Sequence, residues 1–227
     1  MVQTEIIKRV LRIRFAGSVA TAFTLEQDDV QFIITAKHVF ENAKWPNTAT
    51  IELLIDGIYQ SFPVDVRYPK DNRIDIAVLK TNPYQILTPF MGNSFSTAGM
   101  TYGQDVYFLG YPYNYDDLLA GFSGSNSPLP FVKKACLSGM LAPSPSILFL
   151  DGHNNPGFSG GPVCFKKAGD KLFTIAGVIS GYRYSKLPVF DNMNNKTEYY
   201  IKENTGIINA ADISFAVNIA KEWIANP

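Results

Sequence analysis

The sequence predicts an all-β protein, built as an antiparallel barrel or sandwich, for three reasons. Short stretches of apolar or alternating residues recur along most of the chain, and turn-forming residues separate them. These stretches show no β-α-β rhythm, which a parallel sheet would need. Aromatic residues, which favour strands, make up 13% of the 227 residues.

The first half of the chain begins with one expected helix and continues as strands. Thr4 precedes apolar residues at helical spacing, so we expect a short helix capped by Thr4. Residues 11–15 then alternate with period two, which predicts a strand. Two hairpins should follow, one turning at Asp28-Asp29 and the other at Asp56-Gly57.

The rest of the chain continues the strand pattern with two irregular stretches. Further strands are expected at Val64–Tyr68, Ile76–Lys80, Val106–Leu109, Ile147–Leu150, Val163–Phe165 and Leu172–Ser180. Residues 88–104, rich in Gly, Ser and Thr, predict a linker between two halves. Residues 182–209 are polar and rich in asparagine and predict a surface loop, whereas residues 216–225 predict an amphipathic helix.

The composition excludes several classes of function. Basic and acidic residues number 20 each, so no overall field directs the protein to nucleic acid or to a membrane surface. No apolar run is long enough to span a bilayer, and charges interrupt the N-terminus too often for a signal peptide. The two cysteines, Cys136 and Cys164, are expected in the core of a reduced, cytoplasmic protein with no metal site and no cofactor.

The segment Asn155–Val163 carries the most specific chemical signal in the chain. Ser159 lies among glycines, which let backbone N–H groups approach a substrate carbonyl, as a nucleophile requires. The same Gly-x-Ser-x-Gly pattern also occurs in α/β-hydrolases, where a histidine follows the serine. Here the only histidines, His38 and His153, both precede it.

The order of the other polar residues then selects a triad. The order Asp, His, Ser would need Asp28 or Asp29, which lie in the expected turn. His38 ends an apolar strand, and Asp75 opens another, where a carboxylate is costly without a partner such as a histidine N–H. The sequence therefore predicts a catalytic triad of His38, Asp75 and Ser159.

Three segments together resemble the trypsin-like serine peptidases, and within them the Deg/HtrA-type bacterial branch: Thr35–His38, Asp75–Lys80 and Asn155–Pro162. The resemblance implies a chymotrypsin-like double antiparallel β-barrel with a C-terminal helix. Residues 1–95 would form the barrel carrying His38 and Asp75. Residues 96–227 would form the barrel carrying Ser159, plus the terminal helix. We expect no peptide-binding PDZ module after Pro227, in contrast to many members of that branch.

The resemblance also implies a serine endopeptidase that cleaves a polypeptide substrate through an acyl-enzyme. The backbone N–H groups of Gly157 and Ser159 would form its oxyanion hole. His153 would lie near the floor of the specificity pocket, with a loop-shaping role as the alternative. Substrate would add as an extra strand at an edge formed by Ser180, Gly181 and Tyr182.

The sequence departs from the family's pattern at two further places. The usual glycine-rich strand before the histidine is Ala20–Phe23 here, which we expect to repack the first barrel without touching the chemistry. Phe158 replaces the aspartate with which digestive enzymes bind a new N-terminus, so activation by N-terminal cleavage is not expected. A cytoplasmic protease needs restraint. The alternative to an active peptidase is therefore a protein of the same fold that binds peptides without cleaving them, or a protease that a regulatory protein partner activates.

Overall fold

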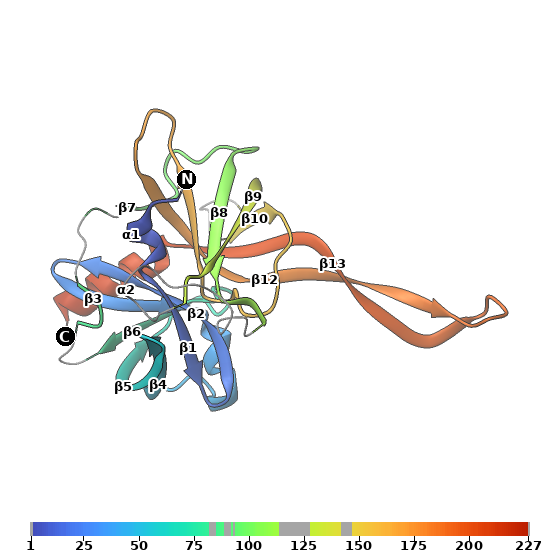
Figure 1. Cartoon of the computed structure of the whole chain (residues 1–227), viewed down its shortest axis with the longest axis horizontal. Coiled ribbons are helices and arrows are strands. Elements are labelled where there is room, and N and C mark those ends of the chain that lie inside the picture. Colours follow the sequence, from blue (N-terminus) through green and yellow to red (C-terminus); the bar gives the residue numbers. More distant parts are fainter. Residues whose placement is uncertain are drawn as a thin grey trace.

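The computed structural model describes residues 2–81, 85–88, 92, 94–113, 128–141 and 147–226, and these are mostly strands, as predicted (Figure 1). The elements in chain order are α1 (Thr4–Ile7), β1 (Val10–Phe15), β2 (Ser18–Gln27), β3 (Val30–Thr35), the 3-10 helix η1 (Lys37–Ala43), β4 (Thr48–Ile55), β5 (Ile58–Arg67), β6 (Ala77–Thr81), β7 (Ser94–Phe95), β8 (Asp105–Gly110), β9 (Phe131–Met140), β10 (Ile147–Asp151), β11 (Pro162–Lys166), β12 (Phe173–Phe190), β13 (Lys196–Asp212) and α2 (Ser214–Ala225). Among the described residues, no helix is long and apolar enough to cross a membrane.

The first half forms a closed antiparallel barrel in the order β1-β2-β3-β6-β5-β4. Its two hairpins turn where the sequence predicts, because Asp28 and Asp29 have φ values of 48° and 62° and Asp56 and Gly57 have values of 50° and 78°. Such left-handed pairs match the twist of the flanking strands. Inward-facing residues fill this barrel, among them Ile13, Ile33, Ile51, Leu53 and Leu79.

The second half forms a sheet in the order β11-β8-β9-β10-β13-β12-β7, and a further pairing of β11 with β12 closes it. Its core includes Phe108, Leu148, Phe158, Phe165 and Ile208. β7 pairs in parallel with β12, so that Ser94 lies opposite Thr174. Pairing with the second barrel therefore begins at residue 94, just before the expected boundary at 95/96.

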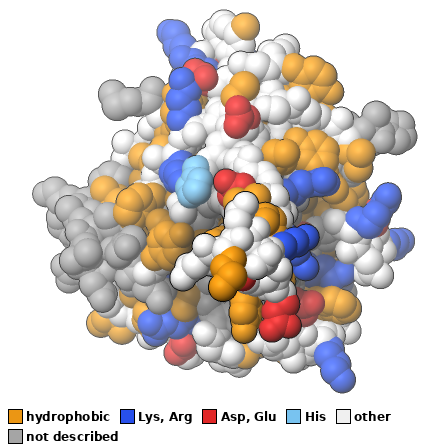
Figure 2. Space-filling model, turned by 90° about the vertical axis from the view of Figure 1, so that its right-hand side faces the viewer, with side chains coloured by type: hydrophobic (Ala, Val, Ile, Leu, Met, Phe, Trp, Pro, Cys, Tyr) orange, Lys and Arg blue, Asp and Glu red, His pale blue; other side chains and the backbone are white. Residues whose placement is uncertain are grey.

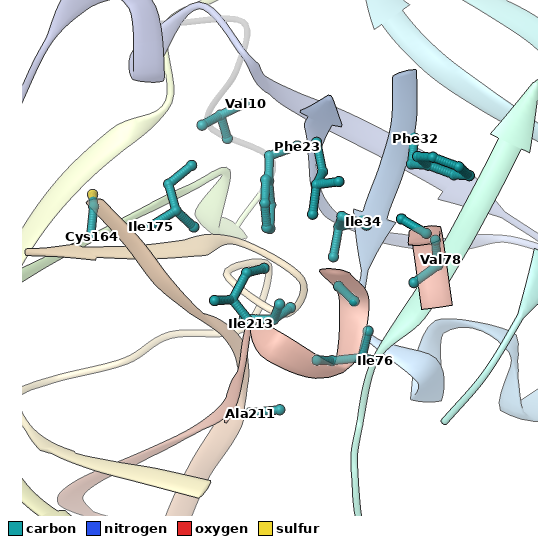
Figure 3. Close-up of a cluster of buried hydrophobic side chains, with 14 of the residues drawn as sticks. Val10, Phe23, Phe32, Ile34, Ile76, Val78, Cys164, Ile175, Ala211 and Ile213 are labelled. Carbon is teal, nitrogen blue, oxygen red and sulfur yellow. The ribbon is translucent and has the colours of Figure 1, made fainter. Parts of the chain in front are cut away.

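A third apolar cluster joins the two barrels (Figure 3). Phe23 and Ile34 from the first barrel lie in one buried cluster with Cys164, Ile175 and Ile213 from the second half. Because this cluster is continuous, it holds the two barrels together along their shared boundary. The loops that carry the candidate site run over the same boundary.

The C-terminal helix α2 packs on the first barrel, although the sequence analysis assigned it to the second unit. Ala216, Ala220 and Trp223 are buried on one helical face, as the amphipathic pattern predicts. The Trp223 ring lies 5.9 Å from that of Phe32, and the Arg67 guanidinium lies 4.3 Å from its centroid. The apolar face of α2 is buried against the first barrel. A local sequence pattern predicts such a face but cannot indicate which barrel it packs on.

Two local expectations are wrong. Gln3, not Thr4, is the N-cap of α1, and it makes no side-chain capping bond. Residues 182–209 form no irregular loop, because β12 and β13 pair through them and extend well beyond the barrel (Figure 1). Aromatic and aliphatic residues lie opposite one another there, such as Leu187 opposite Ile201, and this cross-strand pairing outweighs the polar composition. Of the expected linker at 88–104, residues 89–91 and 93 lie outside the described residues.

Candidate active site

His38 and Asp75 are brought together by two neighbouring strands. His38 lies in η1 directly after β3, and Asp75 comes two residues before β6, which pairs with β3 through Thr35 and Ala77. Asp75 Oδ1 accepts the backbone N–H of His38 at 2.8 Å, and Oδ2 lies 2.7 Å from His38 Nδ1. Because a carboxylate only accepts, Nδ1 carries the proton and Nε2 is left to act as a base.

The protonation of His38 reflects opposing influences. Desolvation by burial lowers its pKa, whereas the hydrogen bond that His38 donates to Asp75, the Asp75 charge and the Glu41 charge raise it. The raising influences prevail, so the pKa of His38 lies above its ordinary value of 6.5. The imidazolium is thereby stabilised beside the carboxylate.

The loop that carries Ser159 is held by both barrels. The backbone N–H of Thr21 in β2 donates to the Ser159 carbonyl at 2.9 Å, and the Thr21 hydroxyl donates to the Gly157 carbonyl at 2.7 Å. On the other side, the N–H of Gly160 donates to Ile179 in β12 at 2.7 Å. The expectation that Ala20–Phe23 leaves the chemistry untouched is therefore wrong, since Thr21 positions the serine loop.

Gly157 and Ser159 present backbone N–H groups in a tightly packed turn. Gly157 has a φ of 102°, and a Cβ on it would lie 2.2 Å from the Tyr111 carbonyl oxygen. The Phe158 side chain is fully buried, with its ring centroid 5.0 Å from that of Phe108. Within the described part of the chain, the N–H groups of Gly157 and Ser159 donate no hydrogen bond. Both are thus available to an oxyanion.

The Ser159 hydroxyl connects the turn to β12. Its Oγ donates to the Ser180 carbonyl at 3.4 Å, and no hydrogen bond to His38 is found among the described residues. Ser180 lies where the β12–β13 register shifts, between Ile179 and Gly181. A Cβ on Gly181 would meet no atom within 4 Å, so the face of the sheet at this residue is open.

Lys133 in β9 is a residue that the sequence analysis missed. Its ammonium donates to the His153 carbonyl and, at 3.0 Å, to Asn155 Oδ1, so it supports the loop that leads to Ser159. Burial lowers its pKa. Lys133 shares its strand face with buried Ala135 and Leu137, and that inward position was the signal available in the sequence. His153 itself is exposed, and among the described residues its ring makes no hydrogen bond.

Metal-ligating residues do not gather near this loop. Among the described residues, no group of three or more His, Cys, Asp or Glu side chains could hold a metal ion. Cys164 is buried between the barrels, where desolvation raises the pKa of its thiol, and Cys136 is half-buried. Neither forms a disulfide.

Replacing Gly157 with alanine is expected to lower kcat for peptide cleavage by about 10²–10³-fold, because the new Cβ would force this turn out of shape. The control is Gly139→Ala, whose Cβ would be 3.5 Å from Phe149 and far from the turn. Kinetics and urea unfolding of both variants check this. Equal kcat in the two variants would contradict a role for the turn.

Comparisons with known proteins bear on the family and the fold. A model of the trypsin-like peptidase domain matches residues 20–172. No curated protein matches the sequence. The solved serine endoprotease from Yersinia pestis is 18% identical, with a TM-score of 0.54, over 97% of this chain and 64% of that chain.

Two further solved structures share the fold. The HtrA-type protease AlgW, solved with a tripeptide, is 16% identical, with a TM-score of 0.55, over 95% of this chain and 60% of that chain. Human heparin binding protein is 13% identical, with a TM-score of 0.62, over 100% of this chain and 95% of that chain. At these identities the likeness shows the fold alone, a chymotrypsin-like pair of β-barrels.

Proposed function

The chain belongs to the trypsin-like peptidase family, as a serine endopeptidase similar to the Deg/HtrA-type branch, and on that premise we propose that His38, Asp75 and Ser159 are its catalytic triad. The observation that carries this proposal is the pair of hydrogen bonds that His38 donates to Asp75, with Nδ1 and Oδ2 2.7 Å apart. Through these two contacts the carboxylate holds both the backbone and the ring of His38.

The chemistry proposed for the site is acyl transfer. The Ser159 hydroxyl turns from Ser180 towards His38 Nε2, which takes its proton as Oγ attacks the scissile carbonyl. The C–N bond then breaks, and His38 gives the proton to the leaving amine. Water, activated by the same histidine, releases the acyl group from Ser159. Asp75 stabilises the imidazolium throughout, and the N–H groups of Gly157 and Ser159 hold the oxyanion.

The substrate is proposed to add as a strand at Ser180, Gly181 and Tyr182. The contact of the Ser180 carbonyl with the Ser159 hydroxyl, and the end of the β11 pairing with β12 at Val178, support this edge. His153 stays a proposed specificity residue, on the position of its loop alone. A cytoplasmic location and control by a protein partner are also part of the proposal. The buried Phe158 supports the latter, since it offers no carboxylate to a new N-terminus.

The test is reaction with a fluorophosphonate probe from pH 5 to 9. Labelling at Ser159 should rise as His38 loses its proton, with a midpoint above 6.5 because the pKa of His38 is raised. Labelling that needs added lysate would support control by a partner. The proposal fails if Ser159 is labelled under no condition, or equally at every pH in this range.

A further inference from the structure

The paired ends of β12 and β13, residues 183–206, form an arm that projects from the second barrel (Figure 1). A two-stranded ribbon alone buries little of its own surface. In the view from the side on which it projects, orange side chains lie among white and charged ones (Figure 2). Its exposed large apolar side chains are Tyr184, Leu187, Phe190, Met193, Tyr199, Tyr200 and Ile201. A gathering of this kind marks an interaction surface.

The arm continues the proposed substrate edge without a break. β12 passes Ser159 at Ser180, and the same strand runs on to Phe190. β11 pairs with β12 only as far as Val178, and from Gly181 onwards the strand that pairs with β12 is β13. The edge of β12 that faces away from β13 is therefore open from the nucleophile into the arm, among the described residues.

One face of the arm carries a pair of like charges. Lys186 and Lys202 lie directly opposite each other across the two strands. The Lys186 ammonium lies 4.4 Å from the Tyr200 ring centroid, and that of Lys202 lies 4.8 Å from the Tyr184 centroid. Like charges placed opposite each other disfavour the pairing of the two strands. The contacts with the two tyrosine rings offset part of this repulsion.

Within the described chain, no carboxylate compensates this lysine pair. The ion pairs there involve Arg9, His38, Arg73 and Lys134. Glu203 is one position from Lys202 and so lies on the other face, where it accepts a hydrogen bond from Ser185. The lysine face is therefore complementary to a carboxylate supplied from outside the chain.

We infer that the arm extends the substrate edge and selects polypeptides with Asp or Glu side chains upstream of the scissile bond. The inference rests on the proposed function. A substrate that runs antiparallel to β12 with its scissile bond at Ser159 places its preceding residues along the arm. Strands advance together by about 3.3 Å per residue, so a side chain roughly six residues before the cut lies beside Lys186.

The test uses a short peptide that the wild type cleaves, found by sequencing the fragments of a denatured protein. The peptide is extended at its N-terminus by about eight residues that carry either glutamate or lysine at alternate positions. For the wild type, kcat/KM should be about three- to tenfold higher with the acidic extension than with the basic one, through KM. High salt should reduce this ratio.

Variants of the arm sharpen the test. In Lys186→Glu/Lys202→Glu the preference should reverse, whereas Lys171→Glu, an exposed lysine in the turn before β12, should keep it. Urea unfolding verifies that each variant is folded.

A wild-type ratio of one overturns the inference while cleavage of the short peptide still upholds the proposed function. A change of oligomeric state in the double variant, with the ratio unchanged, would assign the arm to a second copy of the chain. Cleavage of none of the peptides would contradict both proposals.

Discussion

Replacing Ser159 with alanine is expected to lower kcat for peptide cleavage by about 10⁶-fold, and His38→Ala by a similar factor. Either change disables the nucleophile–base pair of Ser159 and His38, since the serine is a poor nucleophile until the histidine takes its proton. The double variant should lose little more than each single variant. Steady-state kinetics on a cleaved peptide, with active-site titration of the wild type, measure the effect.

The matched control is Ser138→Ala, an exposed serine of β9 whose hydroxyl contacts only the Cys136 carbonyl among the described residues. Its kcat should equal that of the wild type. If Ser159→Ala kept more than about one part in 10³ of the activity, another residue would have to be the nucleophile. Additive losses in the double variant would likewise argue against a joint role for His38 and Ser159.

Asp75→Asn should lower kcat by about 10⁴-fold while it leaves the fold intact. The asparagine amide can donate to His38 Nδ1, which puts the ring proton on Nε2, where it blocks transfer from Ser159. The loss of the carboxylate also removes the bond and the charge that raise the pKa of His38. The pH midpoint of the residual activity should therefore fall below that of the wild type.

Asp71→Asn is the matched control for this variant. Asp71 forms an exposed ion pair with Arg73 in the same connection, and exposed pairs contribute little to stability. Its kcat and its pH midpoint should remain those of the wild type. A midpoint that does not move in Asp75→Asn would show that Asp75 does not set the protonation of His38.

Much of the fold was predictable because its signals are local. The turn at Asp56-Gly57 and the alternation in β1 depend on neighbouring residues, and both lie where the sequence places them. The arm was not predicted, because its polar composition suggested a loop. Strand pairs such as Leu187 with Ile201 stabilise it only after the chain has turned back on itself. Likewise, nothing in α2 indicates that Trp223 covers Phe32 of the other barrel.

The sequence by itself pointed to the candidate triad, since no histidine follows Ser159, while His38 ends one apolar strand and Asp75 opens another. Tertiary structure alone decided how those residues are held. Asp75 meets His38 through paired strands, Thr21 of one barrel supports the Ser159 loop of the other, and Lys133 donates to the segment that leads into that loop. Such contacts join residues far apart in the chain, and their spacing carries no period or motif. The open edge that runs from Ser180 into the arm exists for the same reason, because it depends on where β11 stops and β12 continues.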